Sequence, residues 1–93
     1  MEKCIMPQSD LYKTERFYGS HRHEVFFNSN RQKSIEDGLV VFLTPQQHNL
    51  SKESVHYNRE FDLKLKKIAE QAWLDYYGKT IEDFIKRYGR NYL

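Results

Sequence analysis

The sequence contains little cysteine, proline or glycine. Among its 93 residues there is one cysteine, Cys4, so an intrachain disulfide is excluded, and so is a zinc site made of four cysteines. Cys4 is expected to be an unpaired thiol without a catalytic role, because no histidine and asparagine partners are arranged around it. The two prolines and four glycines stand where one predicted element should give way to the next.

Long hydrophobic runs and a strong charge of one sign are also missing. The longest apolar run, residues 38–43, is too short to cross a bilayer. The first ten residues contain no apolar stretch of signal-peptide length, so we expect a cytoplasmic protein with no membrane partner. The 15 basic and 13 acidic residues leave a net charge of +2, which argues only weakly for a polyanionic partner.

Aromatic residues, by contrast, are abundant. Six Phe, seven Tyr and one Trp make up 15% of the chain, and this share is typical of a folded domain and not of a disordered segment. A length of 93 residues suits a single domain with one small core. We expect an irregular segment over residues 1–20, a ββα motif over residues 21–56 and C-terminal helices over residues 57–93.

Two strands and a short helix are predicted in the first half of the chain. Residues 21–27 end in aromatic and β-branched side chains, as strands often do, and residues 39–43 form a second, more apolar strand. The polar residues 28–38 are predicted to be a long loop, whose closing Glu-Asp-Gly is a turn signal and not an acidic site. Pro45 suits the first turn of a short helix, with Thr44 as its cap.

The C-terminal third has the clearest pattern. Its apolar residues recur at three- and four-residue spacing and form one stripe of a helix of about five turns, which closes at Gly78. The stripe consists of Phe61, Leu65, Ile68, Ala69, Ala72, Trp73 and Tyr76. Its aromatic members are interpreted as core packing. Thr80 can cap a shorter helix over residues 81–88, with Asp83 at the third position and Gly89 as the stop.

These elements predict an α+β fold. A two-stranded antiparallel hairpin with a long loop packs on a short helix, and two C-terminal helices complete the core. A hairpin alone is only marginally stable, so we expect the long helix to supply most of the buried area.

Histidines are the residues best suited to chemistry. His21 and His23 stand two apart on the predicted strand, so their side chains share one face. Packing of the strand against the following short helix would bring His48 near His23, while His56 lies in the polar link before the long helix. Imidazoles and carboxylates bind divalent metals, and a hydrolytic metal needs an open position for water or phosphate. The alternative is four histidines with ordinary solvated or capping roles.

Several stretches, taken together and in order, resemble the small phage- and prophage-encoded proteins of the HNH (ββα-metal) nuclease superfamily. They are HEVFF (23–27), NRQKSI (30–35), DGLVVFL (37–43), HNLS (48–51) and VHYNR (55–59), and the tail of residues 84–93 resembles the end of the same proteins. The similarity covers roughly residues 20–93. It implies a metal-dependent DNA endonuclease, in which a histidine activates water and one divalent metal lies against the scissile phosphate.

The resemblance also implies roles for individual residues. His23 is the candidate general base, since imidazole titrates near neutral pH. His48 and His56 are the candidate metal ligands, and the metal itself (Mg²⁺, Mn²⁺, Ni²⁺ or Zn²⁺) stays open. Glu24 is either a further ligand or the partner of an arginine. Asn58 either orients the water, the base or the phosphate, or serves as the N-cap of the long helix.

Three basic residues are candidates for contacts to DNA phosphates. Arg31 and Lys33 lie between the two predicted strands, and Arg59 stands at the start of the long helix. The alternative for all three is a solvated surface role.

The sequence also departs from the pattern of this superfamily. The cysteine pairs that hold a structural zinc in many members are missing here. The usual pair of adjacent active-site histidines is replaced, by either Arg22-His23 or His23-Glu24. A second hypothesis follows from these departures. In it, the chain is a catalytically degenerate nuclease fold that binds DNA, or that binds a host or phage protein and inhibits a defence nuclease.

Overall fold

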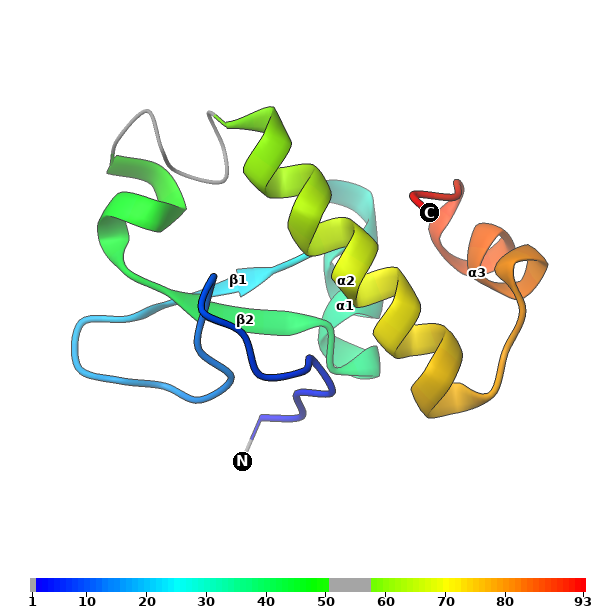
Figure 1. The fold of residues 1–93 in the computed structure, drawn as a ribbon, viewed down its shortest axis with the longest axis horizontal. Coiled ribbons are helices and arrows are strands. Elements are labelled where there is room, and N and C mark those ends of the chain that lie inside the picture. Colours follow the sequence, from blue (N-terminus) through cyan, green and yellow to red (C-terminus); the bar gives the residue numbers. More distant parts are fainter. Residues whose placement is uncertain (1, 51–57) are drawn as a thin grey trace.

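The computed structural model describes residues 2–50 and 58–93 of the chain. In chain order the elements are β1 (His21–Glu24), η1 (Asn28–Asn30), α1 (Arg31–Asp37), β2 (Val40–Leu43), η2 (Gln46–Leu50), α2 (Arg59–Tyr77) and α3 (Ile81–Tyr88), as Figure 1 shows. An antiparallel pair of strands surrounded by helices confirms the predicted α+β class. Within the described residues, none of the helices is both long and apolar enough to cross a membrane.

The two strands pair over four residues each. His21 lies opposite Leu43, and Glu24 lies opposite Val40. Strand β1 is shorter than the sequence predicts, because the chain leaves the sheet after Glu24 and Val25 then enters the core. All four residues of β2 are buried, as its apolar sequence predicts.

The N-terminal segment runs along the outer edge of β2. Residues 2–20 form no helix or strand, as predicted, but they are tied to the sheet by backbone bonds. Lys13 and Phe42 exchange two such bonds, of 3.1 and 2.9 Å, and the Ile5 N–H donates to the Gly38 carbonyl at 2.8 Å. This segment therefore belongs to the folded body, and Figure 1 shows it beside β2.

The segment between the strands differs from the prediction. The sequence predicts a loop over residues 28–38, whereas the structure has the short helix η1 and then α1, which ends at Gly38 with φ at 80°. The buried residues of α1 are Ser34 and Asp37, both polar, so no apolar stripe marks this helix. The Ser34 hydroxyl donates to the Leu39 carbonyl at 2.6 Å and accepts the Phe26 N–H at 3.2 Å.

Both C-terminal helices begin and end as their sequence signals indicate. The Asn58 side chain caps α2 by accepting the Phe61 N–H at 3.1 Å. Thr80 and Asp83 form a reciprocal capping box at the start of α3. Gly78 and Gly89 take the left-handed conformation just after the two helices, with φ at 61° and 95°. A residue with a side chain is strained in this conformation, so glycine is favoured at these helix ends.

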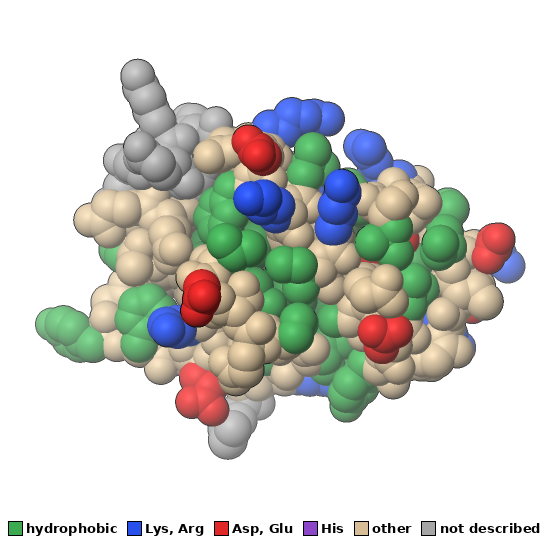
Figure 2. Space-filling model, viewed as in Figure 1, with side chains coloured by type: hydrophobic (Ala, Val, Ile, Leu, Met, Phe, Trp, Pro, Cys, Tyr) green, Lys and Arg blue, Asp and Glu red, His purple; other side chains and the backbone are tan. Residues whose placement is uncertain are grey.

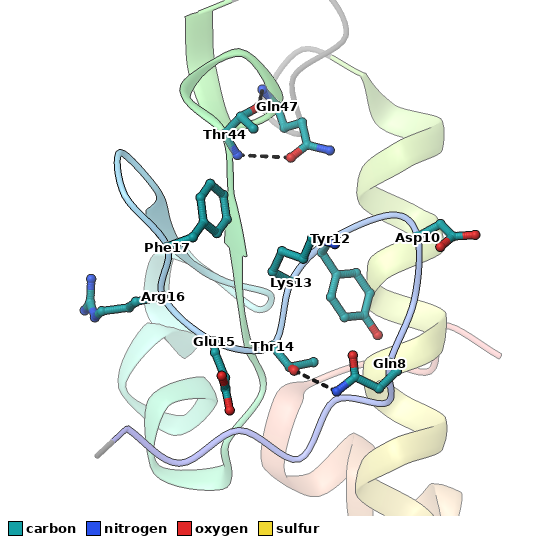
Figure 3. Close-up of a pocket in the computed structure, with 10 residues that line it drawn as sticks. All are labelled: Gln8, Asp10, Tyr12, Lys13, Thr14, Glu15, Arg16, Phe17, Thr44 and Gln47. Atoms are coloured by element: carbon teal, nitrogen blue, oxygen red, sulfur yellow. Dashed lines mark hydrogen bonds between the residues drawn. The ribbon is translucent and has the colours of Figure 1, made fainter.

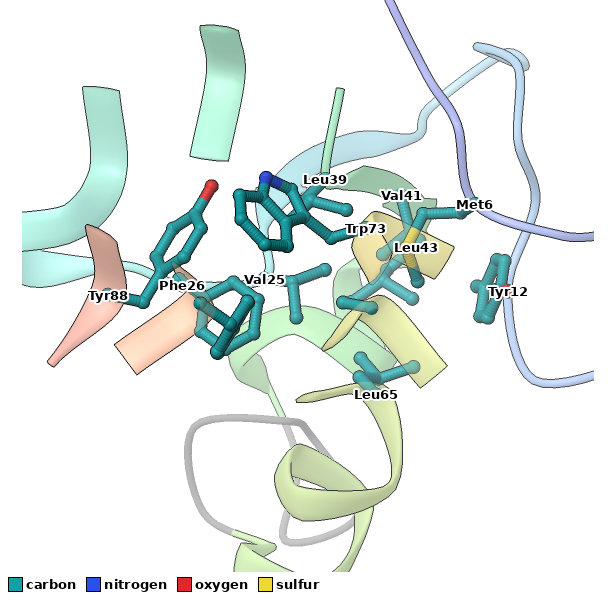
Figure 4. Close-up of a cluster of buried hydrophobic side chains, with 12 residues drawn as sticks. Met6, Tyr12, Val25, Phe26, Leu39, Val41, Leu43, Leu65, Trp73 and Tyr88 are labelled. Atoms are coloured by element: carbon teal, nitrogen blue, oxygen red, sulfur yellow. The ribbon is translucent and has the colours of Figure 1, made fainter. Parts of the chain in front are cut away.

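The hydrophobic core lies between the sheet and helices α2 and α3, and Figure 4 shows most of it. Its buried members are Met6, Tyr12, Val25, Phe26, Leu39, Val41, Leu43, Leu65, Ala69, Trp73, Phe84 and Tyr88. The Phe26 ring lies 5.4 Å from that of Phe84 and 4.7 Å from that of Tyr88. Such offset and edge contacts add to the burial energy of aromatic side chains. Trp73 is buried here, which confirms its interpretation as a core residue, whereas Tyr76, predicted to pack in the same way, is 61% exposed.

A buried carboxylate ties the three α-helices together. Asp37 accepts the Trp73 indole N–H at 2.9 Å, the Tyr88 hydroxyl at 2.7 Å, and the Arg87 Nε–H and Nη2–H at 2.5 and 2.9 Å. We refer to these four residues as the Asp37 network. The Glu-Asp-Gly sequence is thus more than the turn signal that the sequence predicts, because its central residue is a structural anchor.

Candidate functional site

Three of the four histidines meet at one end of the sheet. The Nδ1 atoms of His21 and His48 lie 3.2 Å apart, and the rings of His23 and His48 are 5.3 Å apart between centroids. The His21 and His48 rings are also 5.3 Å apart and nearly perpendicular. These distances confirm that His23 and His48 lie together, as the sequence predicts. We call His21, His23 and His48 the histidine cluster.

Local structure explains how His48 reaches this place. The Gln47 N–H donates to the Thr44 hydroxyl at 3.1 Å, and the Gln47 side-chain oxygen accepts the Thr44 N–H at 3.0 Å. The His48 N–H then donates to the Thr44 carbonyl at 3.0 Å. Thr44 is therefore the predicted cap of the short helix η2. Because His21 is paired with Leu43, at the end of β2, the turn into η2 returns His48 to His21.

His23 occupies the buried side of the cluster. Only 1% of this residue is exposed, whereas His21 and His48 are each partly exposed. Its ring lies 5.6 Å from that of Phe27, and the Lys66 ammonium lies 4.4 Å from the centre of the Phe27 ring. A base that takes a proton from water must be reachable by that water. In this arrangement, the partly exposed rings of His21 and His48 are better placed for that task than His23.

Glu24 lies on the opposite face of β1 from the histidines, because side chains alternate along a strand. One carboxylate oxygen accepts the Arg22 Nε–H at 3.0 Å, and the other accepts the Arg31 Nε–H at 2.7 Å. Of the two roles that the sequence leaves open, the structure therefore favours the arginine partner. The alternative of a metal ligand shared with the histidines does not fit this geometry. Arg31 is engaged in the same ion pair, although it stays largely exposed.

The remaining predicted site residues that the structure describes have other contacts or are exposed. The Lys33 ammonium donates to the Arg87 carbonyl at 2.8 Å, in the last turn of α3, where a cation is favourable. Asn58 is the N-cap of α2, which is one of the two roles the sequence allows. Arg59 is exposed in the first turn of α2. His56 lies outside the described residues.

A pocket that the sequence does not predict opens beside η2. Its volume is about 580 Å³, and Figure 3 shows its walls. It is lined by Gln8, Asp10, Tyr12, Lys13, Thr14, Glu15, Arg16, Phe17, Thr44 and Gln47. The Tyr12 hydroxyl donates to the Pro7 carbonyl at 2.5 Å, and burial raises its pKa to about 12. No periodic pattern marks residues 8–17, so the only sequence signal is their mixture of aromatic and hydrogen-bonding residues.

The histidine cluster fits a divalent metal in part. Two nitrogen ligands of a tetrahedral zinc, with bonds of about 2.0–2.1 Å, lie about 3.3 Å apart. The Nδ1 atoms of His21 and His48 have this spacing, at 3.2 Å, and they share a hydrogen bond whose direction depends on the ring tautomers. A metal would replace the shared proton. Within residues 2–50 and 58–93, no three or more His, Cys, Asp or Glu side chains form a metal-binding group. A metal at this pair would take its other ligands from water, substrate or further residues.

Comparisons with known proteins give no relative for this chain. No family model matches the sequence, no curated protein matches it, and no solved structure matches the fold. The functional argument therefore rests on the residues and their geometry.

Proposed function

We propose that this chain hydrolyses phosphodiester bonds of DNA at the histidine cluster, with a divalent metal bound there. The observation that carries the proposal is the 3.2 Å separation of the His21 and His48 Nδ1 atoms, which come from segments 27 residues apart in the sequence. Neutral imidazoles are good ligands for zinc, nickel and related ions. When bound, the metal would supply an activated water and would stabilise charge on the phosphate.

The three histidines have different roles in binding and positioning the metal. His21 and His48 hold the ion through their facing nitrogens and reach the surface. His23, buried behind His48, fixes the orientation of the His48 ring by an edge contact. The backbone bond from His48 to Thr44 holds η2 against the end of β2, so the ligand pair is positioned before substrate arrives.

Positive charge near the cluster favours a DNA substrate. The Lys66 ammonium lies over the Phe27 ring, which itself contacts His23, and it is paired with the Asp62 carboxylate at 2.9 Å. Further along the first half of α2, Arg59, Lys64 and Lys67 are exposed. Figure 2 shows basic side chains on the face of the molecule that carries α2, in a view where no histidine side chain is seen. Such residues bind phosphates without reading sequence, so they would supply affinity and not specificity.

The experiment is a plasmid-nicking assay with Mg²⁺, Mn²⁺, Ni²⁺ and Zn²⁺. The parent is compared with His21→Ala and His48→Ala, and Gln71→Ala, at an exposed position of α2, is the matched control. We expect metal-dependent nicking in the parent and the control, and a loss of at least about 100-fold in both histidine variants. Calorimetry should show that the same two variants lose metal affinity. A folded parent that nicks with none of the metals would contradict the proposal.

One observation favours a second candidate, a DNA-binding module without catalysis. Glu24, the acidic residue of one of the two candidate active-site pairs, is held by Arg22 and Arg31 on the face away from the histidines. A nuclease needs groups that face the phosphate, whereas a binding module does not. This candidate predicts equal DNA affinity in the parent and in His48→Ala when EDTA is present, and no nicking in either.

A further inference from the structure

We propose that the pocket beside η2 binds one unpaired nucleobase of single-stranded or locally opened DNA, stacked on Phe17. This inference rests on the proposed function, since it names the form of the substrate that the histidine cluster would act on. The pocket has a volume of about 580 Å³, which lies in the usual range for small-molecule sites. A planar base with part of its sugar fits in such a space.

The walls of the pocket are held by internal bonds, so the cavity exists before a ligand arrives. The Gln8 amide donates to the Thr14 hydroxyl at 3.2 Å, across the lower side in Figure 3. The Lys13 backbone is bonded to Phe42 of β2. On the third side, the Gln47 amide donates to the Leu11 carbonyl at 3.3 Å. A preformed site loses less free energy on binding than one that must be ordered.

The chemistry of the lining suits a base better than a phosphate. Its charged residues are two cations, Lys13 and Arg16, and two carboxylates, Asp10 and Glu15, so the site is charge-balanced. The Arg16 guanidinium already binds both carboxylate oxygens of Glu2, at 2.8 and 2.6 Å. Exposed carboxylates repel phosphate but accept hydrogen bonds from amino groups of bases, as Asp and Glu do with cytosine.

Phe17 supplies the surface for stacking. The residue is 38% exposed and stands on the wall opposite Tyr12 in Figure 3. Unstacked bases of single strands commonly bind on aromatic side chains and then form hydrogen bonds along their edges. The pocket combines both requirements, because carboxylates (Asp10, Glu15) and amides (Gln8, Gln47) line the same space as the exposed ring.

The pocket and the histidine cluster share their supports. Thr44 and Gln47 line the pocket, and the same two residues set the turn that positions His48. On the other wall, Phe17 is followed four residues later by His21. Because Thr44 and Gln47 belong to both, we place the backbone of a nucleotide bound in the pocket on the side of the cluster, so cleavage would occur next to an unpaired base.

The test measures DNA binding in EDTA, so that its result does not depend on metal or cleavage. Fluorescence anisotropy compares a short single-stranded oligonucleotide with its duplex for the parent, Phe17→Ala, Phe17→Tyr and Tyr76→Ala. Tyr76 is the matched control, because it is an exposed aromatic residue on α2 that does not line this pocket. We expect Phe17→Ala to weaken single-strand binding by about 5- to 150-fold, the range for loss of one stacked base. Phe17→Tyr and Tyr76→Ala should bind like the parent.

The two proposals fail in different ways. Equal single-strand affinity in the parent and Phe17→Ala, or no measurable binding at millimolar oligonucleotide, would overturn the base pocket even if the protein nicks plasmids. Phe17-dependent binding by a protein that never nicks would support the pocket and overturn the nuclease. Circular dichroism of each variant shows that a lost signal does not come from unfolding.

Discussion

The Asp37 network and the histidine cluster both collect polar side chains from distant parts of the chain, yet they differ in how those side chains are used. Around Asp37, each carboxylate oxygen accepts hydrogen bonds, and the guanidinium of Arg87 balances the buried charge. In the histidine cluster, two ring nitrogens face each other at 3.2 Å, and two of the three rings reach the surface. In the Asp37 network every carboxylate oxygen is hydrogen-bonded and the charge is balanced, which indicates a structural role. In the histidine cluster the two ring nitrogens can share a proton or bind an ion.

The ionisation of the Asp37 network agrees with its structural role. The hydrogen bond with Asp37 raises the pKa of Arg87 far above its usual range, so this residue keeps its charge. Burial, together with the bond to Asp37, raises the pKa of Tyr88, so its hydroxyl keeps its proton. Neither of these two groups changes its charge near neutral pH. Both groups therefore keep their hydrogen bonds to Asp37 over the physiological range of pH.

The largest expected effect comes from breaking the Asp37 network. Asp37→Ala should lower the free energy of unfolding by about 3–5 kcal/mol, because it leaves Arg87 without its buried partner and removes the acceptor of the Trp73 N–H. Urea denaturation followed by the fluorescence of Trp73, the sole tryptophan, measures this change. Glu36→Ala is the control, because Glu36 pairs with the same arginine but is 55% exposed.

The stability of His48→Ala is to be compared with that of Asp37→Ala. If the cluster serves function and not stability, this variant should unfold within about 0.5 kcal/mol of the parent, as surface substitutions usually do. A cost similar to that of Asp37→Ala would show that the cluster is itself structural, and the distinction between the two regions would fail.

A smaller effect is expected at Asn58, where a structural and a catalytic role can be separated. Asn58→Ala removes the cap of α2 and should cost about 1 kcal/mol of stability, whereas Asn58→Asp should keep it, because both side chains accept the Phe61 N–H. Thermal unfolding measures the cap, and plasmid nicking measures catalysis. Loss of nicking in Asn58→Asp, with stability unchanged, would add Asn58 to the functional residues.

The smallest effect is expected at Glu70. This residue is fully buried and accepts the Tyr92 N–H at 2.6 Å, and its burial raises the pKa of the carboxyl above the ordinary 4.5. The folded protein therefore holds this proton more tightly than the unfolded chain does. The contribution of Glu70 to stability falls as the pH rises through the interval between the ordinary and the raised pKa.

Glu70→Gln tests whether ionisation of Glu70 lowers the stability of the protein as the pH rises. The amide keeps the acceptor for Tyr92 but carries no charge, so the melting temperature at neutral pH should rise slightly. The gain should shrink as the pH falls from the raised pKa to the ordinary 4.5, because below that value the parent carboxyl is neutral in both the folded and the unfolded state. A gain of the same size at every pH would mean that the ionisation of Glu70 is not its cause.

Sequence signals were sufficient where they are local or periodic. The apolar stripe of α2 and the capping box of α3 identify both helices, since each signal comes from residues within a few turns of one another. The meeting of His23 and His48 follows from the alternation along β1 and the turn after β2. In these cases, short-range geometry sets the outcome.

The sequence predictions are wrong where hydrogen-bond partners distant in the sequence determine the structure. Helix α1 buries Ser34 and Asp37, whose partners lie in the chain after β1 and in α2 and α3, so no pattern within residues 31–37 marks it. Lys33 holds a carbonyl of α3, 54 residues away in sequence. A lysine with such a partner cannot be distinguished in the sequence from one that binds phosphate.

The N-terminal segment covers an edge of the sheet that could otherwise pair with another chain. An exposed edge of a β-sheet is a template for pairing with another chain and for aggregation. Here the backbone N–H and C=O of Phe42 are both hydrogen-bonded to the backbone of Lys13, and the Cys4 thiol donates to the Val40 carbonyl at 3.1 Å. The outer edge of β2 is therefore already paired. Residues 4–13 thus cover the outer edge of β2, and their removal would expose the backbone of this apolar strand to pairing with another chain.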